Sequence, residues 1–265
     1  MDFIRHYLIA LQFFTRIPVT GRLAVWVGFS PAMLRASAAH FPGVGWLIGC
    51  LVAALSLVLL RHLPPHDLSA LVVAMLGTAV GVLLTGAFHE DGLADVADGL
   101  GGSADRSRAL LIMKDSRVGA FGALALVLVI GCKVALLALI GAIDGATLGW
   151  GLFLAHVASR TFPLLLIRAM VHVGDDAGSK SKPLAEQISG ASLAVASTWL
   201  LAAMALVHWQ APQHPVLSPL VGATLACLWM WRWFHRRLHG FTGDCLGATQ
   251  QVCEVAFYLG LALAL

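Results

Sequence analysis

Long apolar stretches constrain the fold of this chain more than any other feature. Seven of them are long enough to cross about 30 Å of hydrocarbon as helices. Only 12% of the residues are charged, about half the share found in soluble domains, and 59% are hydrophobic. The chain is therefore predicted to be an all-α, polytopic integral membrane protein, a bundle of about seven transmembrane helices. The predicted spans are residues 39–60, 68–88, 119–142, 147–171, 190–209, 215–233 and 246–265.

The first residues follow a different pattern. Phe3, Tyr7, Leu11 and Phe14 share one face of a helix, which is typical of an N-terminal helix that lies in the membrane interface. We find no linker, low-complexity tract or internal repeat, so residues 1–265 are predicted to form one domain in contact with the lipid bilayer. The net charge of +3 is modest and gives no reason to expect nucleic-acid binding.

The basic residues predict an orientation. Lys133 and Arg160 lie inside spans. Arg61 lies on one side of the membrane, and the other fourteen Lys and Arg residues are all assigned to the opposite side. By the positive-inside rule, that side is the cytoplasm, and it holds the connection between the second and third spans. The basic residues assigned to it are Arg5, Arg16, Arg22, Arg35, Arg106, Arg108, Lys114, Arg117, Arg168, Lys180, Lys182, Arg232, Arg236 and Arg237.

This cytoplasmic connection begins with a stripe of acids. On a helix, Asp91, Asp95 and Asp98 lie within roughly 60° of one another on one face. At about 5 Å and an effective dielectric near 20, each pair of carboxylates repels by on the order of 3 kcal/mol. The stripe has no compensating Lys or Arg one turn away, as a solubilising face usually has. It is therefore predicted to bind a metal ion, and the alternative is a solvated face of a short helix.

A second polar segment follows at the mouth of the third span. Lys114, Asp115 and Arg117 lie in a run that ends in glycines, and such residues suit a phosphate group bound together with Mg²⁺. Gly92 and Gly99 would let a ligand approach the backbone closely.

Ionisable residues inside the spans are candidates for function by default. Arg160 and Glu254 are such residues, and the alternative is a structural ion pair between them. Lys133 is equally compatible with a functional and a structural role. Asp244 lies just cytoplasmic of the last span, on the same side as the stripe, and is predicted to contribute to the same site.

The motifs together resemble the cobalamin synthase family. The resemblance is carried by the segments 89–99, 114–122 and 242–254, and by Phe13-Phe14-Thr15-Arg16-Ile17-Pro18 and Phe41-Pro42-Gly43-Val44-Gly45. It extends over almost the whole chain. Gln251 departs from the pattern, because the family has a Glu there, so no catalytic role is assigned to position 251.

The resemblance implies a bacterial inner-membrane transferase that acts late in vitamin B12 assembly, with its active site facing the cytoplasm. It would join adenosylcobinamide-GDP to α-ribazole or its 5′-phosphate, release GMP and require Mg²⁺. A homo-oligomer, or association with other corrinoid-pathway enzymes, is a further expectation. The predicted metal ligands are Asp91, Asp95, Asp98 and Asp115, which form the predicted catalytic set together with Lys114 and Arg117. The predicted substrate-binding residues are His89, Gly92, Gly99, Ser116, Gly119, Arg160, Asp244 and Glu254.

Two other functions were weighed against this one. A CDP-alcohol phosphotransferase-like enzyme also uses helical aspartates and magnesium beside a membrane, but Asp91-Gly92 is not followed here by the Ala-Arg pair of that pattern. A cation transporter would need ionisable groups along its spans, whereas the acids of this chain gather on one side.

Overall fold

The computed structural model describes residues 1–174 and 187–265, and within these ranges the chain is built from helices. The one β-bridge in the described part joins His172 and Phe241. The helices are α1 (Asp2–Phe14), α2 (Gly21–Val27), α3 (Pro31–Ser37), η1 (Ala38–His40), α4 (Phe41–His62), α5 (Ser69–Thr85), α6 (Phe88–Gly102), α7 (Arg106–Ile112), α8 (Ala120–Ile143), α9 (Gly145–Ala169), α11 (Gly190–Gln210), α12 (Leu217–Leu238) and α13 (Gly243–Ala262).

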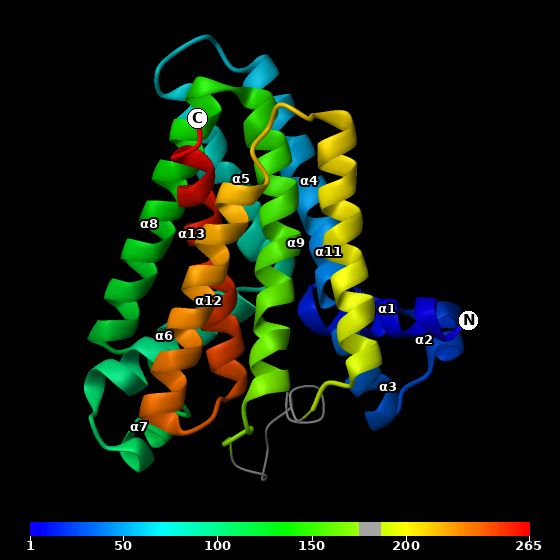
Figure 1. Ribbon diagram of the computed structural model, residues 1–265, viewed down its shortest axis with the longest axis vertical. Coiled ribbons are helices and arrows are strands. Elements are labelled where there is room, and N and C mark those ends of the chain that lie inside the picture. The colour runs from blue at the N-terminus through cyan, green and yellow to red at the C-terminus, as the bar shows by residue number, and fades with distance from the viewer. Residues whose placement is uncertain (175–186) are drawn as a thin grey trace.

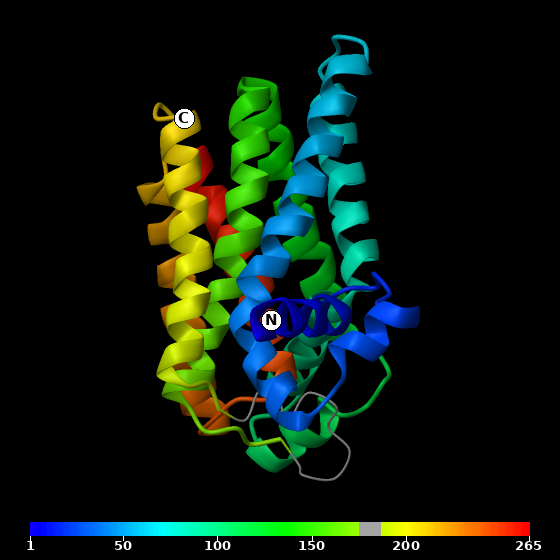
Figure 2. The same ribbon diagram turned by 90° about the vertical axis from the view of Figure 1, so that its right-hand side faces the viewer.

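The long helices run side by side along one axis, with α9 at the centre (Figures 1 and 2). In the most apolar part of α9, 89% of the residues are buried, against 17% in α8 and in α11. The apolar surfaces of α8 and α11 thus face outward, as lipid-facing helices do. The predicted all-α membrane bundle is confirmed.

The number of spans is less well defined than the fold class. Four helical segments are long and apolar enough to cross a membrane, and a bent pair, α5 with α6, makes up to five. All seven predicted stretches contain long helices, but the count of seven is not confirmed. The helix α5 has only 17 residues, and polar side chains lower the hydropathy of α12 and α13. The qualifying segments are Pro31–His62, Ala120–Ile143, Gly145–Ala169 and Gly190–Gln210.

A sharp bend carries the acid stripe away from the bundle axis. The helices α5 and α6 meet at 90° across Gly86 and Ala87, and both residues have left-handed backbone angles, with φ of 66° and 58°. A side chain at Gly86 would collide with that of Arg16, so the position requires glycine for space as well as for conformation. The helix α6 therefore lies across one end of the bundle, beside α7 (Figure 1).

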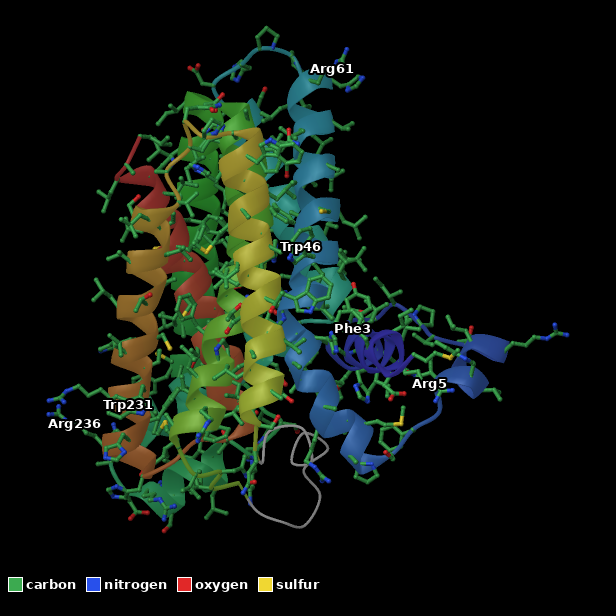
Figure 3. All side chains as sticks on the ribbon, turned by 45° about the vertical axis from the view of Figure 1, so that its right-hand side comes forward. Phe3, Arg5, Trp46, Arg61, Trp231 and Arg236 are labelled. Atoms are coloured by element: carbon green, nitrogen blue, oxygen red, sulfur yellow. The ribbon has the colours of Figure 1, made fainter. Side chains whose placement is uncertain are left out.

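The N-terminal helix α1 also lies crosswise to the long helices, as the predicted interfacial helix requires (Figures 1 and 2). It buries Leu11 and Phe14 against the core. Arg236 lies at the end of the bundle that holds α6, and Arg61 lies at the opposite end (Figure 3). Lys180 and Lys182, which entered the predicted orientation, lie outside the described residues. The single domain remains a prediction.

Candidate functional site

The three aspartates of α6 lie at three depths. Asp91 is exposed, Asp95 is half-buried and Asp98 is buried. A helix face that serves only solubility would leave all three in solvent. The gradient therefore favours a site that takes in a charged group over a solvated surface.

Asp98 ties the third predicted span to the stripe. Its two carboxylate oxygens accept hydrogen bonds from the backbone N–H groups of Gly119, at 2.7 Å, and Gly122, at 2.8 Å. These N–H groups belong to the N-terminus of α8, where helical partners are lacking and a negative charge is favourable. A Cβ atom at either glycine would collide with the Asp98 carboxylate. Asp98 thus caps α8, a role that the sequence alone did not reveal.

Asp95 is partly buried and lies among other carboxylates, and both conditions raise its pKa. Burial raises the pKa of its carboxyl to about 7, and the charges of nearby Asp244, Asp91 and Asp98 add to this rise. Asp244 comes from the first turn of α13, which packs closely on α6 at Gly92. A Cβ atom at Gly92 would lie 2.8 Å from the Asp244 carbonyl oxygen, so only glycine allows this approach. The structure therefore brings Asp244 to the stripe, as predicted.

The segment between α7 and α8 carries the predicted phosphate-binding residues. Arg117 Nη2 lies 2.5 Å from Asp115 Oδ2, and hydrogen bonds from Arg117 lower the pKa of Asp115 to about 2. Lys114, Ser116 and Gly119 are exposed beside this pair. The Asp115 carboxylate is engaged by Arg117 within its own loop. The charges that raise the pKa of Asp95 are those of Asp244, Asp91 and Asp98.

The donor chemistry of the stripe suits a hard cation. Among the described residues, no three His, Cys, Asp or Glu side chains form a ready-made cluster for a metal ion. Mg²⁺ does not require one, because it keeps several waters and is commonly held by one or two carboxylates together with substrate phosphates. Asp91 and Asp95 provide such carboxylates, and burial together with the neighbouring acids raises the pKa of Asp95.

The two stripe glycines pack helices together. Gly92 gives room to the backbone of Asp244, and a Cβ atom at Gly99 would collide with Met113 at the end of α7. Their closest neighbours are therefore α13 and the end of α7. Their predicted contact with substrate stays a prediction.

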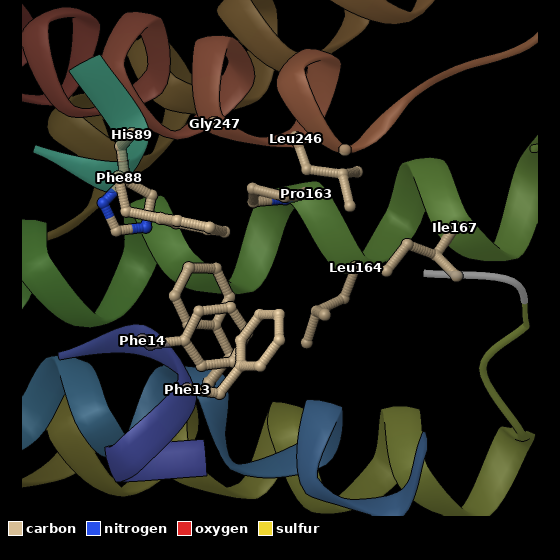
Figure 4. Close-up of a pocket in the computed structure, with 11 residues that line it drawn as sticks. Phe13, Phe14, Phe88, His89, Pro163, Leu164, Ile167, Leu246 and Gly247 are labelled. Carbon is tan, nitrogen blue, oxygen red and sulfur yellow. The ribbon is translucent and has the colours of Figure 1, made fainter. Parts of the chain in front are cut away.

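His89 lines an aromatic pocket next to the stripe (Figure 4). Its ring is buried and stacks on Phe41 with 5.6 Å between ring centroids. The other lining residues are Phe13, Phe14, Phe41, Phe88, Pro163, Leu164, Ile167, Gly243, Leu246 and Gly247.

The ionisable residues within the bundle form a buried network. Glu254 pairs with Lys133 at 2.7 Å between Oε1 and Nζ, and both side chains are almost fully buried. The ion pair of Glu254 with Arg160, the alternative raised from the sequence, is not the one that forms. Arg160 instead lies with Nη1 2.9 Å from Nδ1 of His156. This network is close to His89, because the charges of Arg160, Glu254 and Lys133 act on the His89 ring.

Glu90 is a site residue that sequence reasoning left out. Gln251 donates a hydrogen bond from Nε2 to Oε1 of Glu90 at 2.9 Å, which links α6 to α13. Glu90 Oε2 and Gln251 Oε1 are buried and make no hydrogen bond within the described part of the chain. The departure from the family pattern at position 251 was the one signal in the sequence. It marks Gln251 as unusual, and the structure shows that Gln251 contacts Glu90.

Comparisons with known proteins agree on one family. A family model described as cobalamin-5-phosphate synthase matches residues 6–262. An Albidiferax ferrireducens protein named adenosylcobinamide-GDP ribazoletransferase is 64% identical, over 100% of this chain and 99% of the relative. A Polaromonas naphthalenivorans protein of the same name is 57% identical over the full length of both chains, and one from Vibrio cholerae is 40% identical over 96% of this chain and 91% of the relative. No solved structure gives a significant match.

Proposed function

The chain belongs to the cobalamin-5-phosphate synthase family, and we propose that the aspartate site on α6 carries out its transfer reaction. The chain is an adenosylcobinamide-GDP ribazoletransferase of cobalamin synthesis, as its relatives are named. A hydroxyl of α-ribazole, or of its 5′-phosphate, attacks the phosphorus that bears the corrinoid, and the bond from that phosphorus to GMP breaks. The products are adenosylcobalamin, or its 5′-phosphate, and GMP. The proton of the attacking hydroxyl passes to a base.

One observation carries the assignment of the site. Asp95 is half-buried, has a pKa near 7, and lies close to the carboxylates of Asp91 and Asp244. A carboxyl that is partly protonated at neutral pH is suited to accept a proton or to gain affinity for a cation. Asp244, which lies outside the proposed Mg²⁺-binding pair, would act as the base once it is within about 3 Å of the hydroxyl.

We propose Asp91 and Asp95 as the residues that hold Mg²⁺. When bound, the ion would neutralise charge on the pyrophosphate and on the departing GMP. Asp98 and Asp115 are engaged elsewhere, with the N-terminus of α8 and with Arg117. This observation supports a smaller ligand set than the four aspartates predicted from the sequence.

Lys114 and Arg117 would bind the phosphate oxygens of the GDP moiety. Both are exposed at the same end of the bundle as α6, and Asp98 holds their segment against the stripe through Gly119. A phosphate would compete with Asp115 for Arg117, because both are anions that a guanidinium binds with two hydrogen bonds. Ser116 and Gly119 would add donors from the same loop.

We further propose that this end of the bundle faces the cytoplasm of a bacterial inner membrane. Support comes from the basic residues near α6, including Arg106 and Arg237, and from the position of Arg61 at the far end. A homo-oligomer and association with other corrinoid enzymes stay predictions. The transporter alternative loses its main support because Lys133 and Glu254 neutralise each other inside the bundle.

The experiment measures GMP release from adenosylcobinamide-GDP by purified protein, with α-ribazole and Mg²⁺. Asp91→Asn and Asp95→Asn should each lower kcat by at least about 100-fold, because each removes a charge that acts on the transferred phosphoryl group. The matched control is Asp67→Asn, an exposed aspartate at the opposite end of the bundle, which should turn over normally. Unchanged turnover by Asp95→Asn would refute the proposed site.

A further inference from the structure

The aromatic pocket beside the stripe is built from five helices, α1, α4, α6, α9 and α13. Phe13 and Phe14 of α1 face Leu164 of α9 across it, and Phe88 and Leu246 enter from α6 and α13 (Figure 4). The aromatic rings touch one another: Phe14 stacks on Phe41 at 4.0 Å, and Phe13 meets the edge of Phe88 at 5.8 Å. Phe88 is 39% exposed, so one wall of the pocket remains accessible from outside the protein. The lining is apolar and aromatic, and the cavity of about 30 Å³ would have to widen at the exposed Phe88 ring to seat a flat, mostly apolar ring.

One polar atom in this lining has no partner. His89 is 2% exposed, and its Nε2 atom makes no hydrogen bond within the described part of the chain. Buried ring nitrogens in folded proteins are nearly always hydrogen-bonded, to protein, to water or to a ligand. An acyl chain could fill the apolar part of the pocket but would leave this nitrogen unsatisfied. The lining therefore favours an aromatic heterocycle over a lipid tail.

The pocket and the stripe share the first turn of α13. Gly243 and Gly247 line the pocket, and Asp244 lies between them in the chain. A Cβ atom at Gly247 would lie 3.2 Å from the carbonyl oxygen of His89, so α13 and α6 are in close contact here. A molecule with an aromatic ring in the pocket would thus extend its other end toward Asp244 and Asp95.

We propose that this pocket seats the aromatic base of the acceptor nucleoside, with Nε2–H of His89 donating a hydrogen bond to the free ring nitrogen of that base. The inference rests on the proposed function and adds to it the place of the acceptor. The base of α-ribazole is a benzimidazole, which is flat and largely apolar and carries one ring nitrogen that can accept a hydrogen bond. Its ribose hydroxyls would then face the carboxylates.

The first experiment compares two acceptors, the benzimidazole nucleoside and its indole analogue, in which a C–H replaces the free ring nitrogen. The wild-type enzyme should prefer benzimidazole by about tenfold or more in kcat/KM, because a site built to donate a hydrogen bond rejects an analogue that lacks the acceptor. His89→Phe should abolish this preference and leave the KM for adenosylcobinamide-GDP unchanged. A preference retained by His89→Phe would overturn the assignment of His89.

The second experiment measures binding of α-ribazole to purified protein by equilibrium dialysis, which needs no turnover. Phe88→Ala, a change at a partly exposed position, should weaken binding at least about tenfold. Phe29→Ala is the matched control, because Phe29 is 71% exposed between α2 and α3 and does not line the pocket.

These results separate the two ideas. Normal GMP release by the wild type, with no effect of Phe88→Ala on α-ribazole binding, would refute the pocket and leave the proposed function intact. Absence of GMP release by the wild type would refute the proposed function, and the pocket assignment would fall with it. A phospholipid that stays bound in native mass spectrometry when α-ribazole is added in excess would also overturn the proposal.

Discussion

Asp98 belongs to the acid stripe by its spacing but serves the fold by its contacts. Both of its oxygens are occupied by backbone donors of α8, and the two glycines that supply them leave no space for a side chain. Asp91 has no such engagement in the hydrogen bonds of the described residues. Identical side chains on one helix face can therefore hold different roles, which their surroundings decide.

Removing the Asp98 carboxylate should destabilise the protein more than it affects chemistry. Asp98→Ala leaves the N–H groups of Gly119 and Gly122 without partners, so we expect a loss of about 1–2 kcal/mol, as for a deleted helix cap. Unfolding in detergent by denaturant titration measures it. Asp105→Ala is the control, because Asp105 caps the short, exposed helix α7 through the N–H of Arg108 and should cost less. Equal losses in the two variants would contradict the capping role.

The raised pKa of Asp95 predicts how stability depends on pH. The carboxyl titrates near 7 in the folded protein and near 3.9 when unfolded, so the folded state holds an extra proton between these values. The stability gained from that proton is complete below about pH 4 and is lost as the pH rises through 7. In metal-free protein, Asp95→Asn should therefore raise Tm at pH 8 and leave it unchanged near pH 4. Parallel Tm curves for wild type and variant would contradict the shift.

The bend between α5 and α6 sets the limit of what hydropathy can predict. The sequence predicts a span over residues 68–88 and a helical acid stripe. The stripe is helical, whereas α5 ends at Thr85 and qualifies as a span only together with α6. Glycine at position 86 hints at a break, but Ala87 in a left-handed conformation carries no signal that a sequence reader could use. At this 90° turn Gly86 packs against the side chain of Arg16, a residue far away in the chain, and hydropathy cannot predict such a contact.

Partner choice inside the bundle was likewise beyond the sequence. Hydropathy identifies Lys133, Arg160 and Glu254 as charges within spans and predicts that they pair with one another. Which two meet depends on the rotation of α8, α9 and α13 about their axes, and periodicity does not fix that rotation. The structure joins Lys133 of α8 to Glu254 of α13.

This pair couples α8 to α13, and breaking it should be costly. Lys133→Met leaves the Glu254 carboxylate buried without its cation, so we expect destabilisation of about 3–5 kcal/mol. Glu254 would keep the hydrogen bonds donated by Gln250 and Tyr258, which do not supply a charge. The double variant Lys133→Met with Glu254→Gln should recover most of the loss. The single variant Glu254→Gln completes the cycle, and a loss in the double variant equal to the sum of the two single losses would show that the pair contributes no coupling.

Burial separates the central helix from the outer ones and explains why the chain needs a membrane. The helix α9 is enclosed on nearly all sides, whereas α8 and α11 present long apolar faces to the outside. The acid stripe, the loop with Lys114 and Arg117, and the aromatic pocket all lie toward one end of this bundle, so the proposed site would be reached from one side of the bilayer.

We propose from the positions of the basic residues that this side is the cytoplasm, and cysteine labelling tests the proposal. In a chain without its five native cysteines, Ser107→Cys on α7 and Asp67→Cys before α5 place exposed thiols at opposite ends. Positive-inside asymmetry predicts that a membrane-impermeant maleimide labels position 67 from outside the inner membrane and position 107 only in inverted vesicles. The pair of positions controls for thiol reactivity. Inverting the vesicles exchanges which of the two thiols the reagent can reach, so each thiol is shown to react in one of the two preparations. Labelling of position 107 from outside would reverse the orientation and would move the site to the far side of the membrane.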